Sequence, residues 1–118
     1  SIVSNIDNDM LGPIFKNDRL HEYLDHAISS EDAQSCKPEK KIFQDAVKLS
    51  GLESDSILFV GDSPEHDING AASIGLKTAL ISDGGMPPPL QAGKARIAPD
   101  FTINHLSDLI VIVEKENN

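Results

Sequence analysis

The strongest constraint on the fold is an unbroken apolar run, Ile57-Leu58-Phe59-Val60, that ends at Gly61-Asp62. A run without polar alternation is typical of a strand buried on both faces, as in a parallel sheet covered by helices. A second apolar run follows at Lys77–Ile81, and the residues between them, 67–74, are expected to form a helix that Gly75 ends. The order strand, helix, strand predicts an α/β fold, a three-layer Rossmann-like core around a parallel sheet.

Shorter patterns extend this alternation over the rest of the chain, whose 118 residues suffice for one domain at most. We expect the first strand to start at Ile2 as though its first half were absent, which suggests the carboxyl-terminal portion of a longer protein. The other expected elements are strands at Ala27–Ser29 and Phe101–Ile103, helices at 11–15, 20–24, 39–49 and 105–113, loops at 30–32 and 82–99, and a frayed tail at 114–118.

Charge and composition exclude several classes of function. The net charge is −9 and the pI is about 4.7, whereas nucleic-acid-binding domains usually have clustered Lys and Arg and a pI above about 9. No apolar run approaches the roughly 18 residues that a membrane span needs, so no membrane partner is expected. The single cysteine, Cys36, cannot form an intrachain disulfide, which favours a reducing, cytoplasmic location.

Polar residues stand where the chemistry of a parallel sheet is usually found, at the carboxyl ends of the strands. Ser4-Asn5 ends the first strand, Lys37 precedes the helix that begins near Pro38, and Asp62 follows the third strand with Asp67 five residues later. Taken singly, these residues are explained as turn, cap and solvated surface residues. Together they offer carboxylate oxygens suited to Mg²⁺ and a compact lysine cation suited to a phosphate.

The order of these motifs resembles the haloacid-dehalogenase-like (HAD) hydrolase superfamily, most closely over residues 60–78. The resemblance implies a small phosphorylated substrate, Mg²⁺ as cofactor, and reaction through an aspartyl-phosphate. It implies that Ser4 and Asn5 contact the phosphoryl group and that Lys37 stabilises the nucleophile and the phosphoryl charge. It also implies that Asp62 ligates the metal and that Asp67 is a ligand or holds the metal's bound water.

One departure from the family pattern is large, because no apolar strand ending in Asp-x-Asp is present. Asp7-Asn8-Asp9 has the right letters but is interpreted as helix-capping acid. We therefore expect the nucleophile, the acid/base residue and the cap to belong to a missing amino-terminal segment of the same protein. Its strand would be the central one, between the strands of Ser4 and Asp62, and the isolated chain should be inactive and poorly stable.

Alternative functions remain open at this point. The family's metal-free dehalogenases resemble this chain but have a Ser-Asn type sequence in place of Gly61-Asp62, so Asp62 favours a phosphatase; phosphatase and phosphomutase are not distinguished. A receiver-like signalling domain would use Asp62 as phosphoacceptor with Ser82 nearby. A non-catalytic interaction fragment would recruit a partner through Pro87-Pro88-Pro89.

Overall fold

The computed structural model describes residues 1–5, 16, 22, 24–82 and 97–116. The helix expected at 11–15, most of that at 20–24, the motif Asp7-Asn8-Asp9 and the three prolines lie outside these residues, as does most of the loop 82–99. The strands are β1 (Ile2–Ser4), β2 (Ala27–Ser29), β3 (Leu58–Gly61), β4 (Lys77–Ile81) and β5 (Phe101–Ile103). The helices are α2 (Ser30–Ala33), α3 (Lys40–Ser50), the 3₁₀ turn η2 (Ser54–Ser56), the π-helical η3 (Pro64–Asn69), α4 (Gly70–Ala72) and α5 (Asp108–Glu116).

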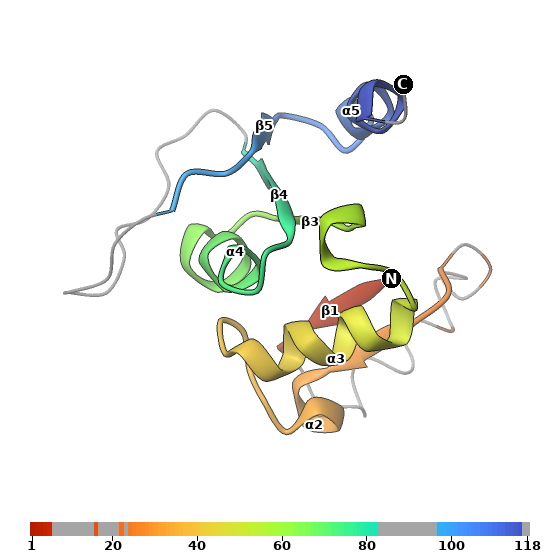
Figure 1. Cartoon of the computed structure of the whole chain (residues 1–118), viewed down its shortest axis with the longest axis vertical. Helices are drawn as coiled ribbons and strands as arrows, with labels where there is room; N and C mark the ends of the chain where they lie inside the picture. The colour runs from red at the N-terminus through yellow and green to blue at the C-terminus, as the bar shows by residue number, and fades with distance from the viewer. Residues whose placement is uncertain (6–15, 17–21, 23, 83–96, 117–118) are drawn as a thin grey trace.

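The strands form two separate parallel sheets in the described part of the chain (Figure 1). One sheet pairs β1 with β2, so that Val3 lies opposite Ile28. The other has the order β3-β4-β5, with Phe59 opposite Thr78 and Leu80 opposite Thr102. The predicted α/β fold with parallel pairing is confirmed, and the sheet is incomplete because β1 and β3 are not hydrogen-bonded to each other.

Helix α3 supplies the centre of the core. Its residues Ile42 and Phe43 are fully buried and cluster with Ile28 of β2 and with Ala71 of α4. A Cβ atom at Gly70 would collide with the ring of Phe43, so α4 approaches α3 more closely than any larger residue would allow. Figure 1 shows α3 beside β1 and α4 beside β4, and α3 and α4 are in contact with each other.

Two helix starts differ from the sequence-based expectation, and serine caps explain both. Residues 30–32, expected as a loop, form α2 because the Ser29 hydroxyl accepts the Asp32 N–H at 3.0 Å. The helix expected at 67–74 begins at Pro64, because the Ser63 hydroxyl accepts the His66 N–H at 3.1 Å. Asp67, expected at the N-cap, therefore lies inside the helix.

The last helix also differs from its expected range, 105–113. It begins at Asp108, whose carboxylate accepts the backbone N–H groups of Asn104 and His105 in the preceding turn. It continues to Glu116, three residues beyond the expected end at Val113, while 117–118 lie outside the described residues. None of the helices in the described ranges is long and apolar enough to cross a bilayer.

Candidate functional site

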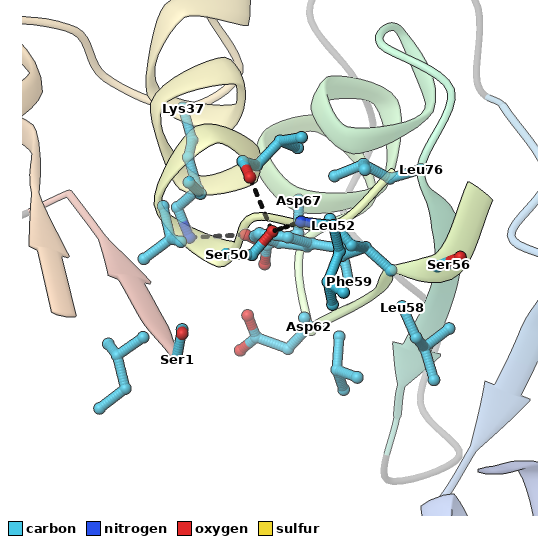
Figure 2. A pocket seen from close by; sticks show the side chains of 17 residues that line it. Ser1, Lys37, Ser50, Leu52, Ser56, Leu58, Phe59, Asp62, Asp67 and Leu76 are labelled. Atoms are coloured by element: carbon cyan, nitrogen blue, oxygen red, sulfur yellow. Dashed lines mark hydrogen bonds and ion pairs between the residues drawn. The ribbon is translucent and has the colours of Figure 1, made fainter. Parts of the chain in front are cut away.

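A buried ion pair lies at the centre of the candidate site. The Nζ atom of Lys37 is 2.6 Å from Oδ1 of Asp67, and Asp67 is only 4% exposed. The second carboxylate oxygen, Oδ2, accepts the backbone N–H of Ser63 at 3.1 Å. Both oxygens of Asp67 are thus engaged by protein donors, and the Lys37 ammonium is directed to one place (Figure 2).

The backbone of Lys37 is held as firmly as its side chain. Oδ1 of Asn5 accepts the Lys37 N–H at 2.7 Å, and Nδ2 of Asn5 donates to the Lys37 carbonyl at 3.2 Å. The ammonium also lies 5.9 Å from the centroid of the Phe59 ring, within the range of a cation–π contact. Lys37 therefore joins the carboxyl end of β1 to the carboxyl end of β3.

Close approach of β3 to η3 depends on Gly61. A Cβ atom at this position would collide with the carboxylate of Asp67, so glycine is needed for the ion pair to form where it does. Sequence analysis singled out neither Gly61 nor Ser63 as a site residue. The signal available was the tetrad Gly61-Asp62-Ser63-Pro64, in which Ser-Pro marks a helix start and Gly permits close packing.

Unlike the carboxylate of Asp67, the carboxylate of Asp62 is available to bind a ligand. It is exposed, lines the same cavity as Lys37 and Asp67, and has no hydrogen-bond or ion-pair partner among the described residues (Figure 2). No cluster of three or more His, Cys, Asp or Glu side chains occurs in that part of the chain. A single available carboxylate completed by water and substrate oxygens suits Mg²⁺, which usually keeps several waters.

Four of the five predicted site residues meet in one place: Asn5, Lys37, Asp62 and Asp67. Ser4 is half-buried as the last residue of β1, next to Asn5 and opposite Ser29, but it does not line the cavity.

The cavity beside these residues has a volume of about 630 Å³. Ile2 and Val3 of β1 lie on one side, Leu58 to Gly61 of β3 on the other, and the end of α3 closes it. Residues Leu58 to Gly61 are only half-buried, although their apolar run suggested burial on both faces. All four residues line this cavity, and Leu58 also lines a second one together with Ile112 and Val113 of α5.

The sequence profile of the HAD-hydrolase-like family matches residues 35–109, which hold Lys37, Asp62 and Asp67. The chain belongs to the HAD-like hydrolase family. This HAD-like chain is 30% identical over 115 residues to (S)-2-haloacid dehalogenase 4A of Burkholderia cepacia, covering 98% of the chain and 48% of the relative. It is 32% identical over 105 residues to the pyrophosphatase PpaX of Bacillus cereus strain AH820, covering 86% of the chain and 45% of the relative.

A solved structure supports the same assignment. The putative HAD-hydrolase YfnB of Bacillus subtilis, bound to magnesium, matches with a TM-score of 0.80 at 26% identity, over 95% of this chain and 47% of that one. The HAD-like chain thus spans less than half the length of each of these proteins. Hydrolases that act on phosphate compounds and on haloacids are both among its relatives.

Proposed function

We propose that this HAD-like chain belongs to a Mg²⁺-dependent phosphatase that acts on small phosphorylated metabolites. The chain supplies the side chains that bind the metal and stabilise the charge of the phosphoryl group. The observation that carries the proposal is the pairing of Lys37 with the buried Asp67 beside the available carboxylate of Asp62. The similarity to a pyrophosphatase and to a magnesium-bound HAD-hydrolase supports it. The free, exposed Cys36 is in keeping with a cytoplasmic setting.

Each side chain has a separate task in this proposal. Asp62 holds Mg²⁺, and the metal, when bound, offsets negative charge on the transferring phosphoryl group. Lys37 presents a fixed positive charge to the phosphoryl oxygens and to the nucleophile. Ser4 donates its hydroxyl to a phosphoryl oxygen at the end of β1.

Asp67 and Asn5 act through Lys37 in this proposal. Protein donors bind both carboxylate oxygens of Asp67, so this residue orients the Lys37 ammonium and the Ser63 backbone. Asp62 would then be the residue that holds the metal. Both polar atoms of the Asn5 side chain bind the Lys37 backbone. In this proposal Asn5 therefore fixes the position of Lys37 and does not itself bind the substrate. Both are positioning residues.

The nucleophile comes from outside these 118 residues. A carboxylate of an amino-terminal segment attacks phosphorus, the ester P–O bond breaks, and the leaving oxygen takes a proton from an acid of that segment. Water then cleaves the aspartyl-phosphate, which releases inorganic phosphate and restores the carboxylate. The chain alone, which offers no such carboxylate in the proposal, is inactive.

Haloacid dehalogenation is the second candidate function, favoured by the dehalogenase relative that aligns with 98% of the chain. That reaction displaces halide by a carboxylate, and Asp62 would add an uncompensated negative charge beside it unless a cation were bound. Asp62 therefore favours the phosphatase.

The test uses the protein extended by its amino-terminal segment. Hydrolysis of p-nitrophenyl phosphate should require Mg²⁺ and be removed by EDTA, whereas 2-chloropropionate should release no chloride. Asp62→Asn should abolish the response to Mg²⁺, while Asp55→Asn, at another exposed aspartate outside the site, should leave it unchanged. Chloride release without metal, together with inert phosphate esters, would replace the phosphatase proposal by the dehalogenase.

A further inference from the structure

One face of β3 brings an aromatic ring next to the buried ion pair. Side chains two residues apart on a strand point to the same face, so Phe59 and Gly61 share one face of β3. A Cβ atom at Gly61 would collide with the Asp67 carboxylate, which places Asp67 directly against this face. The Lys37 ammonium, bound to Asp67, lies over the next side chain of the same face, 5.9 Å from the centroid of the Phe59 ring.

The Phe59 ring is fixed by its own packing. Its centroid is 5.0 Å from that of the Phe43 ring, and the planes of the two rings meet at 64°, an edge-to-face arrangement. Phe43 is fully buried and lies so close to Gly70 that a Cβ atom there would collide with its ring. The ring that the Lys37 ammonium meets is therefore held by the packed core.

The surroundings favour an attraction between this ring and the ammonium. The face of an aromatic ring is electron-rich, and it attracts a cation more strongly where water is excluded. The side chains of Lys37 and Asp67 are only 15% and 6% exposed, so little water competes. The ring also differs from the carboxylate in its effect on a ligand. Asp67 adds a negative charge that repels a phosphoryl oxygen, whereas the uncharged ring adds none.

We propose that Phe59 is a positioning residue, which holds the Lys37 ammonium at the wall of the cavity through the face of its ring. Lys37, Phe59 and Asp62 line this cavity together, so an ammonium kept over the ring stays beside the space that an anionic ligand would fill (Figure 2). The ion pair ties the ammonium to one oxygen of Asp67, and the ring adds a second point of attachment. The effect of Phe59 on catalysis rests on the proposed function, whereas its contact with Lys37 does not.

A graded change in the electrons of the ring separates this role from apolar packing. The protein extended by its amino-terminal segment is prepared with phenylalanines that carry one, two or three ring fluorines in place of Phe59. Each fluorine weakens the attraction of the ring face for a cation and nearly keeps the size of the ring. We expect kcat for p-nitrophenyl phosphate to fall stepwise, by about threefold or more with three fluorines, at nearly constant KM. The same series at Phe101, which lines other cavities, should leave kcat unchanged.

Ordinary substitutions test the contact in two further ways. Phe59→Tyr keeps the ring face and should keep kcat within about twofold, whereas Phe59→Leu keeps only an apolar side chain and should lower kcat by about three- to thirtyfold. A double-mutant cycle of Phe59→Leu with Lys37→Met, followed by urea unfolding, needs no substrate. Phe59→Leu should cost less stability when Lys37 is already replaced, while Phe101→Leu with Lys37→Met should be additive. The fluorine series keeps the test valid if Phe59→Leu folds poorly.

The outcomes distinguish this inference from the proposed function. If hydrolysis remains Mg²⁺-dependent but kcat does not follow the number of fluorines at Phe59, the positioning role is rejected and the phosphatase stands. Equal effects of fluorine at Phe59 and Phe101, or additive losses in the cycle of Phe59 with Lys37, would also overturn the positioning role. Non-additive losses in an extended protein that hydrolyses no phosphate ester would support the contact of Phe59 with Lys37 and reject the phosphatase.

Discussion

Lys37 and Asp67 are 30 residues apart in the sequence, yet their charged atoms lie 2.6 Å apart in the structure. The pair is more than an ion pair, because the other oxygen of Asp67 fixes the Ser63 backbone and Asn5 fixes the Lys37 backbone. Three segments of the chain thus converge on one lysine.

Removing Asp67 should destabilise the fold. Asp67→Ala leaves the Lys37 charge partly buried without its partner and the Ser63 N–H without its acceptor, and the free energy of unfolding should fall by about 3 kcal/mol. Asp45→Ala, which breaks the exposed pair with Lys41, should cost less than about 1 kcal/mol. Urea unfolding of both variants measures the difference, and equal losses would contradict the importance given to the buried pair.

Gly61→Ala should destabilise the fold by about 1–3 kcal/mol, because its Cβ atom displaces the Asp67 carboxylate. The collision involves the carboxylate and the Cβ atom of Asp67, so the double variant Gly61→Ala with Asp67→Gly, which removes both, should cost clearly less than the sum of the two single changes. Gly51→Ala is the control, since it strains a backbone with φ of +70° but meets no atom within 4 Å. Strict additivity in the double-mutant cycle would show that Gly61 does not act through Asp67.

Asn5→Ala should lower kcat of the extended protein with little change in KM. The physical reason is that Asn5 holds the Lys37 backbone, so its loss misplaces the lysine without removing a substrate contact. Steady-state kinetics with p-nitrophenyl phosphate provides the measurement. A raised KM at unchanged kcat would instead make Asn5 a substrate-binding residue, as the family resemblance implies.

Lys37→Ala and Asp62→Ala should each lower kcat/KM of the extended protein by about two to three orders of magnitude, the scale expected for a key electrostatic group. Asp67→Asn should cost less, because the amide oxygen can still accept one of the two hydrogen bonds. Isothermal titration with Mg²⁺ should show lost affinity for Asp62→Ala alone. Retention of most activity and most Mg²⁺ affinity by Asp62→Ala would remove Asp62 from the metal site.

The 118-residue chain by itself should hydrolyse no phosphate ester at any Mg²⁺ concentration and should unfold at low urea. Both expectations follow from the proposal that the nucleophile and the central strand are supplied by another segment. Robust Mg²⁺-dependent turnover by the purified chain would contradict the first, and cooperative unfolding at high urea the second.

Much of the fold could be predicted from the sequence because its signals are local. The apolar runs of β3 and β4 predict strands, and the apolar periodicity of α3 predicts a helix. Gly51 ends α3 as expected, in the left-handed conformation that favours glycine. The starts of α2 and η3 differ from the expected ones because Ser29 and Ser63 cap these helices, each through a hydrogen bond to a backbone N–H three residues later.

The site residues could be named from motif order, and the family resemblance left open whether Asp67 is a metal ligand or holds the metal's bound water. Only the fold shows that Asp62 is exposed and that Asp67 is buried against Lys37. The hydrogen bonds between the Asn5 side chain and the Lys37 backbone join residues 32 positions apart, and no local sequence pattern indicates them. Burial and long-range hydrogen bonds are properties of packing, which a single sequence does not express.

The pairing of Lys37 with Asp67 has a consequence for the order in which ligands can arrive. The side chains of Lys37, Asp67 and Asp62 together carry a net negative charge, because one ammonium stands against two carboxylates. A phosphate dianion that approached an empty site would meet net repulsion, whereas a divalent cation would be attracted and would reverse the local sign. The expected kinetic scheme is therefore sequential, with cation before phosphate, and phosphate leaving before the cation.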